Sequence, residues 1–201
     1  MRTTVSSERN RDLPASYPFE PTSTIKSLFK ESGTMSKLIN CPGCGASVPD
    51  LPGLPHKYIG ATMGCWEIYT QILAKEYGEF RYPEHTHRMT VDTYAVQHPG
   101  QPGRQSIQSV NGHLLSLHFL IDRGMTGKEA TAAFSRVLRN ADSLTWLTPP
   151  VPNGTLTVLD VVIAPTLDEH TKLVESWANN VWEAWSPHHA TIRKLADQFM
   201  R

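Results

Sequence analysis

Apolar side chains recur every three or four residues over most of the chain after residue 64, which is the spacing of one buried helix face. The clearest stripe is made by Ile107, Val110, Leu114, Leu117 and Ile121. It predicts a helix over residues 104–123 that ends at Gly124, since glycine is a common stop signal. This stripe is the strongest single indication that the protein is helical.

Similar patterns predict further helices at about residues 65–77, 90–97 and 126–139, another from Leu167, and a last one starting at Ser186. Residues 155–163 fit two structures. Their β-branched side chains favour a strand, whereas Thr157 and Asp160 have the spacing of a helix capping box. The whole pattern predicts a mainly α fold, an irregular helical bundle preceded by a loop.

The first 34 residues differ from the rest, because they are rich in Ser, Thr, Arg and Pro and show little apolar periodicity. This composition predicts a disordered tail over residues 1–34, followed by a single helical domain over residues 35–201. Met35 is an alternative natural start, since Met-Ser-Lys-Leu-Ile-Asn leads directly into a cysteine motif. Residues 41–64 are dense in Cys, Pro and Gly, which predicts the loop before the bundle.

Two cysteines, Cys41 and Cys44, form a Cys-Pro-Gly-Cys-Gly turn, and Cys65 follows at a predicted helix N-terminus. Thiolates are good zinc ligands, and zinc takes four ligands in a tetrahedron. The sequence therefore predicts a zinc-binding loop with three cysteine ligands. His56 lies between the cysteines and is our first choice for the fourth ligand, with His85, His87 and His98 as alternatives.

Two other interpretations of the cysteines stay open at this point. The Cys-x-x-Cys pair is also typical of redox dithiols, although in that motif a helix follows directly, and here Gly45, Pro49 and Pro52 follow instead. The three cysteines could also be free thiols without a special role.

Histidines and acidic residues gather in the central part of the chain, on helix faces that the pattern predicts to be buried. We expect a second polar site between helices, metal-bearing or not, built from His87, Asp92, His98, His113 and His189. Glu76 also falls on the buried side of its helix and needs a partner there. For His113, a core position bonded to backbone or to a carboxylate is the alternative.

Composition narrows the class of protein. The 201 residues carry 19 basic and 19 acidic side chains, so a formal net charge of zero makes nucleic acid an unlikely partner. The longest apolar runs are too short to cross a membrane, and the N-terminus lacks a secretory signal. An odd count of 3 cysteines argues against an extracellular disulfide framework. We therefore expect a cytoplasmic protein.

No Ser-His-Asp elbow, phosphate loop or dinucleotide fingerprint occurs in the chain, so the motifs fix no reaction. The leading hypothesis is a zinc-binding helical protein that acts as a binding or adaptor module for a protein or small-molecule partner. The alternative is a metal-dependent enzyme, a hydrolase or thiol transferase, that uses the inner histidines. Trp177, Trp182 and Trp185 share one predicted helix, which is typical of a core or of an oligomer interface.

Several segments resemble an uncharacterised bacterial family that is known only as a domain of unknown function. They are CPGCGA from Cys41, GCW from Gly64, HRMTVDTYAVQHPG from His87, HLLSL from His113, LTVLDV from Leu156 and WANNVWEAWSPHH from Trp177. The resemblance covers nearly all of residues 40–195 and implies one unbroken domain. A weaker likeness is to helical-bundle metalloenzymes of the DinB type, whose His-x-x-x-His pair is missing here.

Overall fold

The structure, a computed structural model of the chain, describes residues 30–31, 34–35, 37–139 and 144–199. Most of the predicted tail over residues 1–34 lies outside the described residues. Where this segment meets the predicted domain, strand β1 (Lys30–Glu31) pairs antiparallel with β2 (Thr34–Met35). A second antiparallel hairpin, β3 (Leu38–Asn40) with β4 (Ser47–Pro49), immediately precedes the helices. This hairpin falls partly in the segment predicted to be loop.

The expected mainly helical fold is confirmed. In the described part of the chain the α-helices are α2 (Met63–Tyr77), α3 (Glu84–Gln97), α4 (Arg104–Ile121), α5 (Gly127–Arg139), α6 (Val158–Val162), α7 (Leu167–Ala184) and α8 (His189–Phe199). A short 3₁₀ helix, η2 (Ser186–His188), joins the last two. None of these helices combines the length and apolar composition that crossing a bilayer requires.

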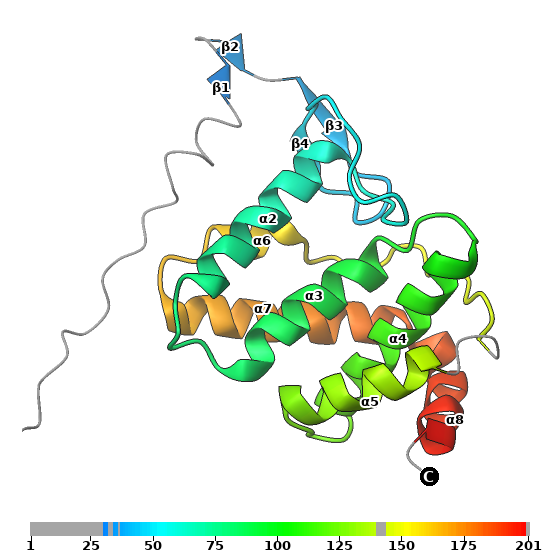
Figure 1. Ribbon diagram of the computed structural model, residues 1–201. Helices are drawn as coiled ribbons and strands as arrows, with labels where there is room; N and C mark the ends of the chain where they lie inside the picture. The colour runs from blue at the N-terminus through cyan, green and yellow to red at the C-terminus, as the bar shows by residue number, and fades with distance from the viewer. Residues whose placement is uncertain (1–29, 32–33, 36, 140–143, 200–201) are drawn as a thin grey trace, which may run out of the picture.

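Helix α3 lies at the centre of the bundle and packs against α2, α4, α5 and α7 (Figure 1). The β3–β4 hairpin sits at the N-terminal end of α2, and α6 packs between α2 and α7. Helix α8 closes the opposite end against α4. Because α3 has neighbours on several sides, buried residues that are close along α3 face different partners.

Local capping explains where the helices begin. Thr62 caps α2 by accepting a hydrogen bond from the Cys65 backbone N–H, so the helix starts two residues earlier than predicted. Thr157 and Asp160 form the reciprocal capping box, which settles residues 158–162 as helix rather than strand. Helix α3 starts at Glu84 instead of residue 90, so it also includes the polar segment that precedes residue 90.

The three tryptophans of the C-terminal region belong to the core. Trp177, Trp182 and Trp185 are each at most 1% exposed. The indole of Trp177 donates to the Gln97 side-chain oxygen (3.0 Å), and that of Trp182 donates to Asp122 (3.1 Å). Of the two roles that the sequence allowed, the core role is the one that the structure shows.

A glycine in the middle of α4 marks a close helix contact. A Cβ atom on Gly112 would lie 2.5 Å from a ring carbon of Phe134 on α5. Alanine normally stabilises a helix interior by roughly 1 kcal/mol relative to glycine. We expect Gly112→Ala instead to lower the free energy of unfolding by about 1–3 kcal/mol, since overpacking outweighs the helix gain. Urea unfolding, with the open position Gly103→Ala as control, measures the difference.

Candidate metal centre

The Cys41–Cys44 turn is built by the short β-hairpin. The Cys41 N–H donates to the Ala46 carbonyl (2.9 Å), and the Gly45 N–H donates back to the Cys41 carbonyl (2.8 Å). Gly45 adopts a φ of 76°, in the left-handed region where glycine is favoured. These bonds fold the turn so that the two cysteine side chains are presented on one side, toward α2 and α3.

Cys65 and His98 complete the cluster from two helices. Cys65 lies in the first turn of α2 and is fully buried, with its Sγ 3.8 Å from the Cys44 Sγ. His98 caps the C-terminal end of α3, and its Nε2 lies 3.4 Å from the Cys65 Sγ. The other ring nitrogen, Nδ1, is 2.8 Å from the Tyr94 carbonyl oxygen, which can only accept. Nδ1 therefore carries a hydrogen, and Nε2 is the ring nitrogen that faces the cysteines.

One ligand atom from each of Cys41, Cys44, Cys65 and His98 lies within 4.8 Å of all the others, so this cluster could hold a metal ion. It is the one group of three or more Cys, His, Asp or Glu side chains in the described part of the chain with this geometry. The cysteines come from the hairpin and α2, and the histidine from α3, so a bound ion would join three elements.

The electrostatics of the cluster favour a cation. Hydrogen bonds with Cys44 and Cys65 hold the pKa of Cys41 well below its ordinary value. Hydrogen bonds with Cys41 and Cys44, with burial, raise the pKa of Cys65. Burial alone would lower the pKa of His98, but hydrogen bonds with Cys41 and Cys44 outweigh it and raise that pKa to about 9. Cys41 thus holds a negative charge in a buried site, where a positive partner stabilises it.

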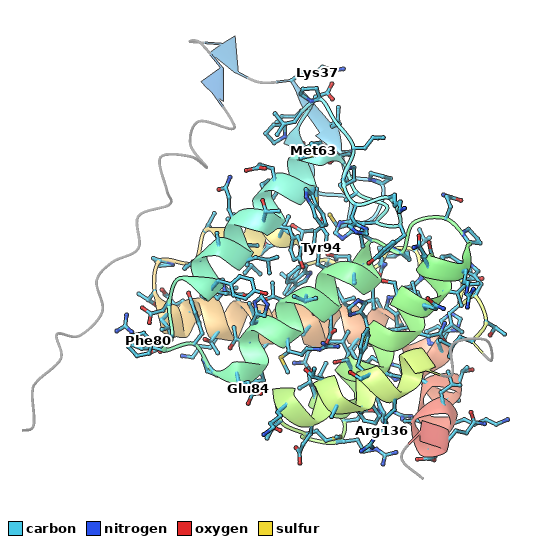
Figure 2. The ribbon with its side chains drawn as sticks, viewed as in Figure 1. Lys37, Met63, Phe80, Glu84, Tyr94 and Arg136 are labelled. Atoms are coloured by element: carbon cyan, nitrogen blue, oxygen red, sulfur yellow. The ribbon has the colours of Figure 1, made fainter. Side chains whose placement is uncertain are left out.

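Aromatic rings and one glycine shape the wall around the cluster. Tyr94 stacks on Tyr69 (ring centroids 3.8 Å apart), contacts the His98 ring, and directs its hydroxyl at the Cys65 Sγ (3.8 Å). Figure 2 shows Tyr94 between α2 and α3. A Cβ atom on Gly43 would lie 2.4 Å from His98 Cδ2, so only glycine leaves room for the imidazole there.

A surface hollow of about 410 Å³ lies next to the cluster. Its floor is the cysteine turn, one wall is the start of the α3–α4 loop, and the other is the loop at 149–154. The side chain of Gln97 holds this second wall, because its amide donates to the carbonyls of Asn153 (2.9 Å) and Leu156 (2.8 Å). Asn153 in turn donates to the Val96 carbonyl (2.9 Å). The hollow is therefore bounded by loops that buried amides fix in place.

His56, our first choice from the sequence for the fourth ligand, is not a member of the cluster. Its ring contacts Tyr58 (centroids 4.2 Å apart) and lies 6.4 Å from the Trp66 ring. His98 takes the fourth position because the end of α3 folds back onto the hairpin, with the Gly60 N–H bonded to the His98 carbonyl (3.0 Å). His56 lies between Cys44 and Cys65 in the sequence, but in the structure it is not part of the cluster that they form.

The residues expected to form a second site do not converge. His98 belongs to the cysteine cluster, and His87, eleven positions earlier on α3, is bonded through Nδ1 to Glu76 of α2 (2.8 Å). At 1.5 Å per helical residue these two positions are about 16 Å apart. His189 donates through Nε2 to the Trp182 carbonyl (3.0 Å). Asp92 and His113 are the two members that meet, with Oδ1 and Nδ1 2.6 Å apart.

Each inward carboxylate instead has its own local partners. Buried Glu76 accepts hydrogen bonds from His87, from Thr90 (2.6 Å) and from His170 of α7 (2.9 Å). These bonds hold the pKa of Glu76 below its ordinary value although burial acts in the opposite direction. The sequence pattern indicated that Glu76 needs a partner, but His170 lies 94 positions away and no periodicity connects them.

The sequence was compared with curated proteins, solved structures and protein families. No curated protein and no solved structure matches the chain. The sequence model of one family, described as a family of unknown function (DUF5946), matches residues 39–186. This range contains the hairpin turn, the start of α2 and the end of α3, and therefore all four side chains of the cluster. The protein belongs to the family DUF5946.

Proposed function

We propose that Cys41, Cys44, Cys65 and His98 bind one zinc ion. Three thiolates and one imidazole are a ligand set typical of structural zinc. The observation that carries the proposal is the spacing of the ligand atoms. With Zn–S bonds of about 2.3 Å, two sulfur ligands of a tetrahedral site lie about 3.8 Å apart. The Cys44 and Cys65 sulfurs are 3.8 Å apart, and His98 Nε2 is 3.4 Å from the Cys65 sulfur.

The role that this ligand set supports is structural. Four protein ligands close the coordination sphere, whereas a catalytic zinc keeps a position for water or substrate. The ion would fasten the β3–β4 hairpin to α2 and to the end of α3, and so shape the hollow beside them. A zinc-stabilised binding or adaptor module in the cytoplasm, where thiols stay reduced, is the function that we propose.

The alternative, a metal-dependent hydrolase or thiol transferase built on inner histidines, finds no support in the arrangement of those histidines. It requires His87, His98 and His113 to face one cavity. Those three side chains have separate partners in the described structure, namely Glu76, the cysteine cluster and Asp92.

The choice between His98 and His56 gives the test of this proposal. We expect His98→Ala, purified from zinc-supplemented cells, to hold clearly less than one zinc per chain. The reason is that the substitution removes one of the four proposed ligands. His56→Ala is the matched control and should keep about one zinc, as the wild type does. Elemental analysis of the three proteins measures the difference. Zinc loss in His56→Ala with full retention in His98→Ala would contradict the assignment.

A further inference from the structure

Helix α8 is attached to the bundle by charged side chains at the end of α4. It packs against α4 and lies after residue 186, where the match to the family model ends (Figure 1). Arg193 of α8 donates to Asp122, which ends α4 (3.1 Å), and Arg123 donates to Asp197 of α8 (2.8 Å). Two ion pairs therefore connect α8 to the same short segment of the chain.

His118 is a buried histidine that contacts both residues of this segment. Its Nε2 lies 3.2 Å from Nε of Arg123, and its Nδ1 lies 2.9 Å from the Asp122 carboxylate. The Arg123 N–H can only donate, because a guanidinium stays protonated in proteins. Nε2 of His118 must therefore accept, so the ring hydrogen is on Nδ1 and is donated to Asp122. This arrangement requires the neutral form of His118.

Protonation of His118 is incompatible with these contacts. A hydrogen on Nε2 would face the Arg123 N–H, so that bond would be replaced by repulsion between two cations. Burial lowers the pKa of His118, and the charges of Arg123 and Arg193 act in the same direction, against the hydrogen bond and charge of Asp122. The closed arrangement of α8 therefore favours the uncharged ring.

Helix α8 carries two further titratable groups in this region. Asp197 pairs with Arg123, and the His189 ring stacks on Trp182 of α7 (centroids 3.9 Å apart). The Trp182 ring lies 6.0 Å from that of His118. Within the described part of the chain, no side chain of α5 is among the main charges that act on His118. His189 is therefore the neighbour whose titration an experiment must separate from that of His118.

We propose that His118 is an acid-sensitive latch, which holds α8 on α4 in its neutral form and releases it when protonated. Once α8 opens, the ring becomes accessible and its pKa returns toward the ordinary value of about 6.5. The open state then binds the proton more tightly than the closed state. Opening therefore becomes up to about tenfold more favourable per pH unit below 6.5, until the pKa of the closed state is reached. It would uncover Ile192 and Ala196, which are fully buried when α8 is closed.

Hydrogen exchange of the full, zinc-loaded chain at pH 7.0 and pH 5.5 tests the latch. We expect the protection of the α8 amides, corrected for intrinsic exchange rates, to fall roughly three- to tenfold at the lower pH. The protection of α2 should stay within about twofold. Because α2 carries Cys65, loss of zinc in acid would lower protection there, and so the comparison separates the latch from the proposed zinc centre.

His118→Gln is the matched control, because a glutamine amide can accept from Arg123 and donate to Asp122 without titrating. In this variant the protection of α8 should be the same at both pH values. A pH response that persists in His118→Gln would assign the effect to His189 or another group and would overturn the inference.

NMR of the wild-type histidine ring nitrogens gives a readout that needs no variant. We expect His118 to be in its Nδ1–H form at pH 7, with a titration midpoint below about 6.5. An Nε2–H form, a higher midpoint, or an equal loss of protection in α2 and α8 would overturn the inference. The latch does not depend on the zinc centre, so each of these results would leave the proposed function standing.

Discussion

Replacing Cys65 with serine is expected to remove the zinc and to lower the melting temperature by about 10 °C or more. Zinc-binding energy is coupled to folding wherever the site forms only in the folded chain. A loss of about 4 kcal/mol corresponds to roughly 8–16 °C for a domain of this size. Cys65 is fully buried at the junction of the hairpin and α2, so the hairpin would lose its attachment to the bundle. The helices should persist, since most of the hydrophobic core between them lies away from the cysteine cluster.

Calorimetry with and without a chelator separates zinc loss from a packing defect. In the presence of a reductant, a strong chelator should lower the melting temperature of the wild type toward that of Cys65→Ser, and should leave the variant unchanged. If chelation leaves the wild-type melting temperature unchanged, the stability attributed to zinc is absent and the structural role is contradicted.

Removing the buried carboxylate of Glu76 is the second change with a large expected effect. Glu76→Ala leaves His87, Thr90 and His170 without the acceptor that all three share. Breaking a buried, hydrogen-bonded charge site typically costs about 3–5 kcal/mol, since the remaining polar groups stay desolvated. We therefore expect the free energy of unfolding in urea to fall by about that amount while the zinc content stays at the wild-type level.

Two measurements check that this loss comes from the carboxylate. Glu67→Ala, on the same helix but only partly buried, should cost less than about 1 kcal/mol. The folded-state pKa of Glu76 is lowered, so its contribution is present above the unfolded pKa of about 4.3 and is lost as pH falls through the folded pKa. The stability gap between wild type and Glu76→Ala should therefore narrow in acid. A gap that widens below pH 4 would contradict this account.

Local signals predicted most of the bundle. The stripe around Leu114 and the capping pair Thr126–Glu129 gave helices close to α4 and α5, because both depend on neighbours three or four residues apart. Helix α3 was predicted too short. Its buried face is rich in polar residues such as Thr86, Thr90 and Asp92, so hydrophobic periodicity missed its first turns.

The candidate site shows the same limit. The spacing of the cysteines predicted that Cys41, Cys44 and Cys65 share one site, because a turn and a helix start are local features of the sequence. The choice of histidine depends on how the end of α3 packs against the hairpin, which is a long-range contact that sequence spacing does not encode. His87 and His113 were both expected to face inward, but the carboxylates they bind belong to different helices, α2 and α3.

X-ray absorption spectroscopy at the zinc edge of the full chain tests the central claim most directly. The account predicts about one zinc per chain, surrounded by three sulfur atoms at about 2.3 Å and one imidazole nitrogen at about 2.0–2.1 Å. The nitrogen contribution should change in His98→Ala and stay the same in His56→Ala. A shell dominated by oxygen, a sulfur count of two or fewer, or purified protein that folds fully without zinc would contradict it.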